Sequence, residues 1–284
     1  MENSLLLGKT AKRVLFFFFV VLCFSFTHEA NAQNLIYVDS AATGNNNGTS
    51  WSDAFTGLQP ALDAANPFDT IWVAKGTYKP SKDANGNSSP ADASTKTFQL
   101  VDSVYLYGGF AGTETRLSDR DWETNSTILS GDIGTEGDIT DNTYHVVSGT
   151  DSCRLDGFVI RDGYADISAG DYGHGGGMFN YTFGEDLENL SIANCTFLNN
   201  HAMTSGNAMY NYNCKNLLIE NCIFEDNSQV SGESPIGGAA YSYSSTGSIE
   251  HCDFLNNETT GHAGAIYNEN GKVDIIHCYF KTNL

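Results

Sequence analysis

A six-residue motif, Cys-x-Phe-x-x-Asn, occurs four times in the last third of the chain, at steps of 27, 30 and 26 residues. Repeats of this period are typical of solenoids, propellers and arrays. One repeat is too short and too rich in Gly, Asn and Ser to bury an apolar face alone, so successive units must stack on each other. The four copies are Cys195/Phe197/Asn200, Cys222/Phe224/Asn227, Cys252/Phe254/Asn257 and Cys278/Phe280/Asn283.

The spacing inside the motif predicts a strand and a turn. Cys and Phe are two residues apart and therefore lie on one face of a strand, which we expect to be the inner face. Equivalent residues of stacked coils lie about 4.8 Å apart, so they form columns. Asn falls where the strand turns, and it tolerates the left-handed conformation there. Stacked Asn amides can also hydrogen-bond along the column.

A second marker precedes each copy of the first, always in the same order. It consists of small residues followed by an apolar and an aromatic residue, and we expect it at a corner where a Cβ would be crowded. The four segments are Gly175–Phe179, Gly206–Tyr210, Gly237–Tyr241 and Ala263–Tyr267.

The two markers together resemble the paired FxxN and GGA[ILV] repeats of polymorphic outer membrane proteins and, more broadly, the parallel β-helix proteins with a pectin-lyase-like fold. The repeats carry this resemblance over residues 150–284, and Tyr37–Asp39, Gly48–Trp51 and Ile71–Pro80 resemble the opening of secreted bacterial β-helix proteins. The resemblance implies an all-β chain, a right-handed parallel β-helix solenoid with a short N-terminal capping helix. It names no substrate, because β-helices serve many functions.

Residues 1–32 have the pattern of a secretory signal peptide. Lys9, Lys12 and Arg13 precede the apolar run 14–26, and Ala30-Asn-Ala32 is a cleavage site before Gln33. A lipoprotein anchor at Cys23 is the alternative, although no small residue precedes it. We therefore expect export to the medium or to the cell surface of a bacterium, the outer membrane included.

The mature chain begins with an expected cap over residues 33–69. The cap contains a strand at Leu35–Val38 and a helix that starts at Ser50 and carries an apolar stripe from Trp51 to Ala65. Residues 70–284 form the β-helix, with irregular coils to about residue 150 and regular repeats after it. Because the chain stops one residue after the last Asn, we expect a C-terminal truncation, with a surface anchor in the missing part.

The charge of −20, from 14 basic and 34 acidic residues, disfavours nucleic acids and anionic membranes as partners. This negative charge favours cations as ligands, Ca²⁺ among them. Six cysteines remain after cleavage at residue 32. The four periodic ones are better explained as small buried hydrophobic residues than as disulfides, because neighbours in a parallel ladder point the same way. The apolar run 14–26 holds only thirteen residues, which is short for a membrane span.

No catalytic, cofactor or metal residue is assigned. The non-histidine basic residues beyond 130 adjoin no obvious acidic cluster on a neighbouring coil, which argues against a pectate-lyase-like reaction. His174 lies in a Gly-His-Gly tripeptide similar to that of polygalacturonases, but their other motifs are absent. The acidic loop with Asp132, Glu136, Asp138 and Asp141 matches no calcium-binding spacing, so a solvated loop is favoured over a Ca²⁺ site.

Aromatic residues recur on the face opposite to the consistently apolar Met178, Met209, Ala240 and Ile266. Stacked outward tyrosines either bind sugar rings or stabilise the ladder, and we favour stabilisation. The candidate glycan platform is Tyr181, Tyr210, Tyr212, Tyr241 and Tyr243, and Phe179 and Tyr267 lie in the same columns.

Three functions remain open after the sequence is read. The first is an exported structural or adhesive contact surface that binds an extracellular glycan or a surface protein of a host or neighbouring cell. The second is a polysaccharide lyase or glycoside hydrolase. The third is a Ca²⁺-dependent carbohydrate-binding module.

Overall fold

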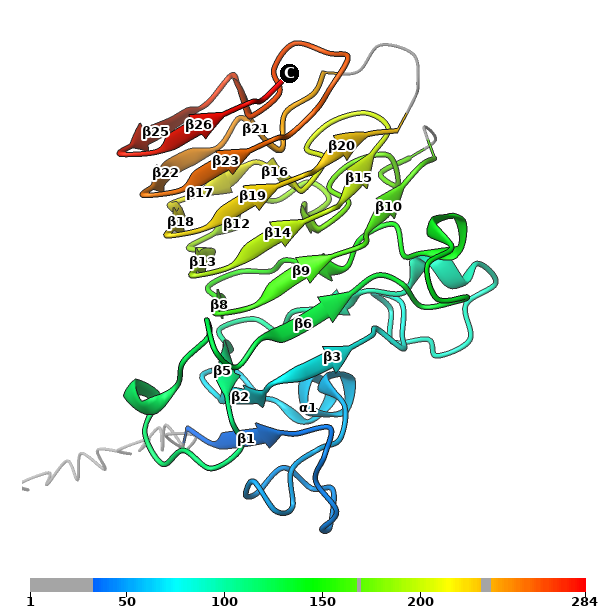
Figure 1. Ribbon diagram of the computed structural model, residues 1–284, viewed down its shortest axis with the longest axis vertical. Helices are drawn as coiled ribbons and strands as arrows, with labels where there is room; N and C mark the ends of the chain where they lie inside the picture. Colours follow the sequence, from blue (N-terminus) through cyan, green and yellow to red (C-terminus); the bar gives the residue numbers. More distant parts are fainter. Residues whose placement is uncertain (1–32, 168–169, 231–235) are drawn as a thin grey trace, which may run out of the picture. The chain divides into compact units, whose positions relative to one another are not determined.

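The computed structural model describes residues 33–167, 170–230 and 236–284, so the signal-peptide prediction for residues 1–32 lies outside the described residues. These residues form a parallel β-helix, and Figure 1 shows its coils stacked from the N-terminal strand to the C-terminal one. Neighbouring coils pair in parallel along three long sheets. The predicted all-β solenoid is therefore confirmed.

The first sheet contains eight described strands, and the chain enters each coil through it. They are β1 (Leu35–Val38), β2 (Thr70–Ala74), β5 (Tyr105–Phe110), β8 (Arg154–Asp156), β13 (Ser191–Ala193), β18 (Leu217–Glu220), β22 (Thr246–Glu250) and β25 (Lys272–Ile276). The second sheet follows in each coil. Its described strands are β3 (Gly76–Tyr78), β6 (Thr127–Ser130), β9 (Val159–Arg161), β14 (Thr196–Leu198), β19 (Ile223–Glu225), β23 (Asp253–Leu255) and β26 (Tyr279–Lys281).

The third sheet closes the coil. Its described strands are β4 (Phe98–Gln99), β7 (Val147–Ser148), β11 (Met178–Asn180), β16 (Met209–Tyr212), β21 (Ala240–Tyr243) and β24 (Ile266–Glu269). Two small sheets lie at the corners, formed by β10 (Tyr164–Ala165), β15 (His201–Ala202) and β20 (Ser228–Gln229), and by β12 (Leu187–Glu188) and β17 (Cys214–Lys215). Short 3₁₀ helices cover Ala93–Thr95, Leu117–Asp119 and Ile139–Asp141.

The Cys and Phe of the repeat form the predicted internal columns. Phe197, Phe224 and Phe254 are fully buried and stack with ring centroids 5.0 and 4.6 Å apart. The thiols of Cys195, Cys222 and Cys252 lie in the same core, and all six described cysteines are free. The column is less protected in the last coil, where Phe280 is 46% exposed.

The Asn residues of the repeat form a buried hydrogen-bonded ladder. Asn200 Nδ2 donates to Asn227 Oδ1 at 3.1 Å, and Asn227 Nδ2 donates to Asn257 Oδ1 at 2.9 Å. Asn227 Nδ2 also donates to the Phe197 carbonyl at 2.9 Å, so the ladder satisfies backbone groups as well as side chains. The ladder confirms the expected stacking of Asn amides.

The expectation that this Asn itself takes the left-handed conformation is wrong. The preceding residue has the positive φ, and a second one stands just before each Cys. The Asn of the motif does not take the left-handed conformation, because its side chain must point inward to hydrogen-bond along the column. The left-handed pairs are Asn194 and Asn199, Asn221 and Asp226, His251 and Asn256, and His277 and Thr282.

Glycine occupies the other corner in three of the four repeats, and the fourth has Ala263. Gly175 and Gly206 have φ of 58° and 63°. A Cβ on Gly206 would lie 2.2 Å from the Met209 carbonyl oxygen. A side chain at Gly206 would collide with the backbone of its own coil, so the predicted crowding is confirmed at this position.

The N-terminal end differs from the expected cap. The helix α1 (Leu58–Ala64) has Gly57 as its N-cap, seven residues later than the predicted N-cap Ser50. The Ser50 hydroxyl accepts a hydrogen bond from the Asp53 amide at 3.1 Å and therefore holds a turn. Leu58, Ala61 and Leu62 pack into the core beside β1, which is already a strand of the first sheet.

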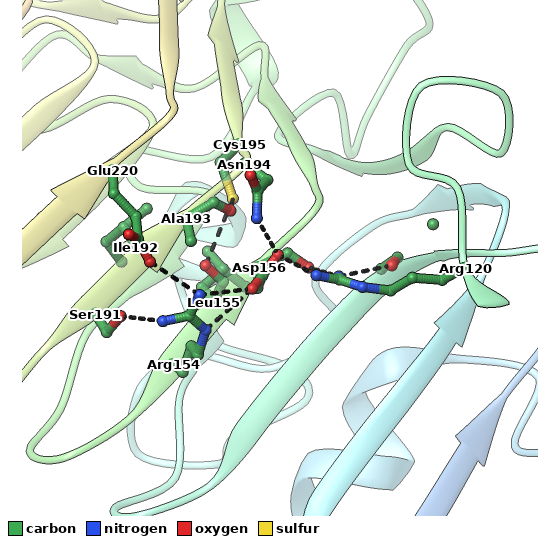
Figure 2. Close-up of polar contacts among 12 residues, drawn as sticks. Arg120, Arg154, Leu155, Asp156, Ser191, Ile192, Ala193, Asn194, Cys195 and Glu220 are labelled. Atoms are coloured by element: carbon green, nitrogen blue, oxygen red, sulfur yellow. Dashed lines mark hydrogen bonds and ion pairs between the residues drawn. The ribbon is translucent and has the colours of Figure 1, made fainter. Parts of the chain in front are cut away.

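An ion-pair network attaches the excursion 111–126, between β5 and β6, to the first sheet (Figure 2). Arg120 reaches Asp156 from one side at 2.5 Å and Arg154 reaches it from the other at 2.8 Å. The Asp156 side chain is 3% exposed. The Arg120 guanidinium also lies over the rings of Tyr107 and Trp122, at 5.0 and 4.8 Å.

Arg154 additionally contacts Glu220, two coils away, at 3.1 Å. The acidic partners of Arg154 thus lie on its own strand and two coils away, and not in an acidic cluster on the adjacent coil. A single carboxylate of the adjacent coil, Asp186, lies 3.7 Å from Lys215 Nζ. The Asp156 carboxylate accepts from both guanidinium groups and from Asn194 Nδ2 at 2.9 Å. Because these charges satisfy one another, we interpret the network as a structural anchor.

Replacing Asn227 by Ala should destabilise the fold by about 2–3 kcal/mol, because it leaves buried groups of two neighbouring coils without partners. The chemical denaturation midpoint measures this. Asn256→Gly is the matched control: it removes an exposed Asn side chain at a left-handed corner, where Gly is tolerated, and should leave the midpoint nearly unchanged. Equal midpoint shifts for the two variants would contradict the ladder's role.

Candidate functional site

A cleft of about 730 Å³ lies on the outer face of the third sheet, over its irregular N-terminal coils. Gln99, Ser148 and Phe179 come from neighbouring strands β4, β7 and β11 and stand in register on that face. They form the floor. The polar excursion at 83–95 and the segment 170–172 form the walls.

The excursion is held in place by a buried tyrosine. Tyr144 Oη donates to Asp92 Oδ2 at 2.7 Å, while Asp92 Oδ1 accepts from the Ser94 amide at 3.0 Å and so caps a 3₁₀ turn. The Tyr144 ring also lies 5.0 Å from Tyr172, on the opposite wall. Tyr144 therefore contacts both walls of the cleft, whose floor is the third sheet.

His145 stacks on the floor of the cleft. Its ring lies 4.5 Å from the Phe179 ring at an interplanar angle of 11°, and 6.1 Å from Tyr172. Its Nδ1 lies 3.2 Å from the Gly175 carbonyl oxygen. Because a carbonyl oxygen can only accept, Nδ1 carries the proton and Nε2 of the neutral ring is an acceptor.

Burial lowers the pKa of His145 to about 4, since the residue is 7% exposed and charging it there would require desolvating the imidazolium. The hydrogen bond to Gly175 opposes this shift. His145 is therefore neutral near pH 7.

The tyrosine columns continue from Phe179 along the sheet toward the C-terminal coils. Phe179, Tyr210, Tyr241 and Tyr267 stack with centroids 5.2 to 5.6 Å apart and planes within 12° of parallel. Rings stacked in this way cover each other's faces and leave edges and hydroxyls at the surface. Tyr241 is only 4% exposed, and its hydroxyl donates to Glu269 Oε2 at 3.0 Å.

Tyr181 departs from this stacking. Tyr212 and Tyr243 are parallel, 5.0 Å apart, but the Tyr181 ring meets Tyr212 at 72°. Tyr181 lines the cleft, and the neighbouring Phe183 is 92% exposed. Of the five tyrosines of the candidate glycan platform, Tyr181 is thus the one in the cleft, and Tyr210, Tyr212, Tyr241 and Tyr243 extend the face beyond it.

The other candidates from the sequence lie outside the cleft. His174 Nδ1 is 2.8 Å from the hydroxyl of Ser205, which is 1% exposed, so this pair is a contact between coils. In the acidic loop, Asp132 and Asp141 accept hydrogen bonds from the Gly137 and Thr135 amides. Among the described residues, no group of three His, Cys, Asp or Glu side chains is arranged to hold a metal ion.

Sequence reasoning did not identify Gln99, His145, Tyr172 or Asp92 as site residues. All four belong to irregular coils or excursions, where no repeat fixes which residues share a face. The available signal was the length and polarity of the segment 81–96, which is rich in Ser, Asn, Asp and Gly.

No family model and no curated protein matches the sequence. Two solved structures are similar in fold. One is a rhamnogalacturonan lyase, at 15% identity and a TM-score of 0.46; the alignment covers 86% of this chain and 56% of the lyase, so this chain spans little more than half of its length. The other is a pectin methylesterase in complex with hexasaccharide VII, at 10% identity, a TM-score of 0.34 and coverages of 88% and 81%.

Within the described residues, no helix has the length and apolar character needed to cross a membrane.

Protonation of His145 should weaken the fold at low pH. Its pKa is about 4 in the folded protein and near its ordinary value of 6.5 after unfolding, so the unfolded chain binds one more proton between these pH values. Stability supported by the neutral ring is complete above pH 6.5 and is lost as pH falls toward 4. The contribution to the slope is at most about 1.4 kcal/mol per pH unit.

Denaturation of the wild type and of His145→Gln across this pH range measures the contribution. The slope of the variant should be smaller, whatever its stability at pH 7. Parallel curves would contradict the neutral state of His145.

Proposed function

We propose that the protein binds a short stretch of a glycan chain in the cleft on the third sheet. The observation that carries this proposal is the combination of an open volume of about 730 Å³ with the partly exposed ring of Tyr181, which does not join the parallel stack, the exposed Tyr172 and a polar floor at Gln99. Sugar-binding sites need an aromatic surface for the apolar face of a sugar and fixed polar groups for its hydroxyls, and this cleft supplies both.

We further propose that the protein is exported and acts at the bacterial surface or in the medium, as a rigid contact surface for an extracellular glycan of a host or neighbouring cell. The support is in the sequence: the signal-peptide pattern of residues 1–32 and the resemblance of the repeats to those of polymorphic outer membrane proteins. A stacked solenoid suits this role, because each coil adds length without changing the faces of its neighbours.

Hydrolysis of the bound glycan is a second candidate function, favoured by two carboxyl groups near the cleft wall. Burial raises the pKa of Asp166, and the charge of Asp92 raises it further. A carboxyl group whose pKa is raised, close to a second carboxyl group, is a pairing that glycoside hydrolysis uses. Release of reducing ends that disappears in Asp166→Asn, with glycan binding retained, would support this function; no release by the wild type would exclude it for the glycans tried.

Substituting Tyr181 by Ala should weaken glycan binding about 5- to 30-fold, which corresponds to about 1–2 kcal/mol of lost ring contact. Calorimetric titration with defined hexasaccharides measures this. Tyr243→Ala should have little effect, because its ring is stacked beyond the cleft. Tyr279→Ala, on an exposed ring of the second sheet, is the control for nonspecific loss.

Unchanged affinity in Tyr181→Ala would contradict the assignment of the cleft. A larger loss in Tyr243→Ala than in Tyr181→Ala would place the binding surface on the tyrosine columns instead.

A further inference from the structure

The polar side chains of the cleft present hydrogen-bond acceptors to a ligand. The Gln99 amide nitrogen is turned to the backbone, within 3.3 to 3.4 Å of the carbonyls of Leu100, Ser148 and Gly149, so its amide oxygen is the atom left for a ligand. His145 contributes an acceptor at Nε2 for the reason given above.

The hydroxyl donors of the cleft are largely engaged within the protein. Thr97 and Ser148 hydrogen-bond each other through their hydroxyls at 3.0 Å. The Thr95 hydroxyl donates to the Asp92 carbonyl, and the Thr182 hydroxyl donates to the Glu185 carbonyl, both at 2.7 Å. The side-chain donors that remain are one hydroxyl hydrogen of the Thr97–Ser148 pair, the Thr150 hydroxyl, the tyrosine hydroxyls and the Asn85 and Asn87 amides.

The formal charge of the cleft is negative. Asp83, Asp92 and Asp171 line it, and no Lys or Arg is among the described lining residues. Asp83 and Asp92 accept one or two hydrogen bonds each from their own loop, which leaves lone pairs free on both carboxylates. Asp171 is exposed and makes no hydrogen bond or ion pair with another described residue.

We propose that the glycan bound in this cleft carries protonated amino groups, as a chain of amino sugars does. The inference rests on the proposed function and adds the chemical class of the ligand. An ammonium group supplies three donors and accepts none, so it complements a site of acceptors. It is attracted by the carboxylates, and the faces of Tyr172 and Tyr181 offer cation–π contact to the same charge. A polyuronate would instead set carboxylate against carboxylate.

Three hexasaccharides of equal length separate the alternatives: hexaglucosamine, hexa-N-acetylglucosamine and hexagalacturonate. Calorimetric titration at pH 5.5, where the amines are protonated, should rank hexaglucosamine first by about 10-fold or more and hexagalacturonate last. Raising the salt concentration should reduce the preference for hexaglucosamine, because exposed charges are screened.

The charge of the whole chain would also attract a polycation, so a matched pair of variants is needed. Asp171→Asn removes one charge inside the cleft and should weaken hexaglucosamine binding about 3- to 10-fold while leaving the N-acetylated hexamer unchanged. Asp226→Asn removes one charge at an exposed left-handed corner, where the neighbouring coils already have Asn199 and Asn256, and should leave both affinities unchanged.

Equal affinities for the amine and N-acetylated hexamers, or equal losses in the two variants, would overturn the inference and leave glycan binding in place. Tightest binding of hexagalacturonate would do the same. If none of the three hexasaccharides binds, both the inference and the proposed function fail for these glycans.

Discussion

The in-register hydrogen bonding between successive coils is the constraint on which the rest of the structure depends. Each strand of a coil pairs in parallel with its equivalent in the next coil, so the same kind of side chain recurs about every 4.8 Å. Inside the solenoid this gives the Phe column and the Asn ladder. Insertion of one residue into a strand would turn its inward side chains outward, and the ladder would lose its partners.

The same constraint decides where function can lie. An aromatic residue that repeats on the outer face stacks on its equivalents, and stacking covers the ring faces that a sugar would need. Phe179, Tyr210 and Tyr241 show this: they stabilise the sheet and expose little more than edges. A usable aromatic face requires a break in the column. The break occurs at Tyr181, whose ring is turned by 72° relative to Tyr212, at the boundary between regular and irregular coils.

The sequence predicted the regular half of the fold in detail because its signal is periodic. Cys222, Phe224 and Asn227 each repeat in register, and two independent markers agree on the same alignment. The helix start was misplaced because Ser50 is a good cap residue in isolation, while the local hydrogen bond to Asp53 formed a turn instead. The left-handed residue was predicted one position too late. Asn is favoured both at left-handed positions and where an amide must point inward, so the residue type alone does not distinguish the two roles.

The cleft was beyond sequence reasoning for a related reason. Gln99, Ser148 and Phe179 share a face only through the pairing of β4, β7 and β11, and their residue types have nothing in common that would align them. The walls come from segments whose length follows no repeat. Only coordinates bring Asp92 to Tyr144 across 52 residues of sequence.

Excursions of this kind are compatible with the solenoid because they attach to it through a few side chains and leave the strand register unchanged. Arg120 holds one excursion to the first sheet through Asp156, and Tyr144 holds another to the third sheet through Asp92. In both places the charged or phenolic group is satisfied by its partner, so the core columns beneath are not disturbed. The floor of the cleft is thus set by the register of the helix, and its walls, with their carboxylates, can vary independently. The carboxylates of the cleft can vary in the same way, since Asp83 and Asp92 lie in the excursion 83–95 and Asp171 lies in the segment 170–172, both outside the paired strands of the third sheet.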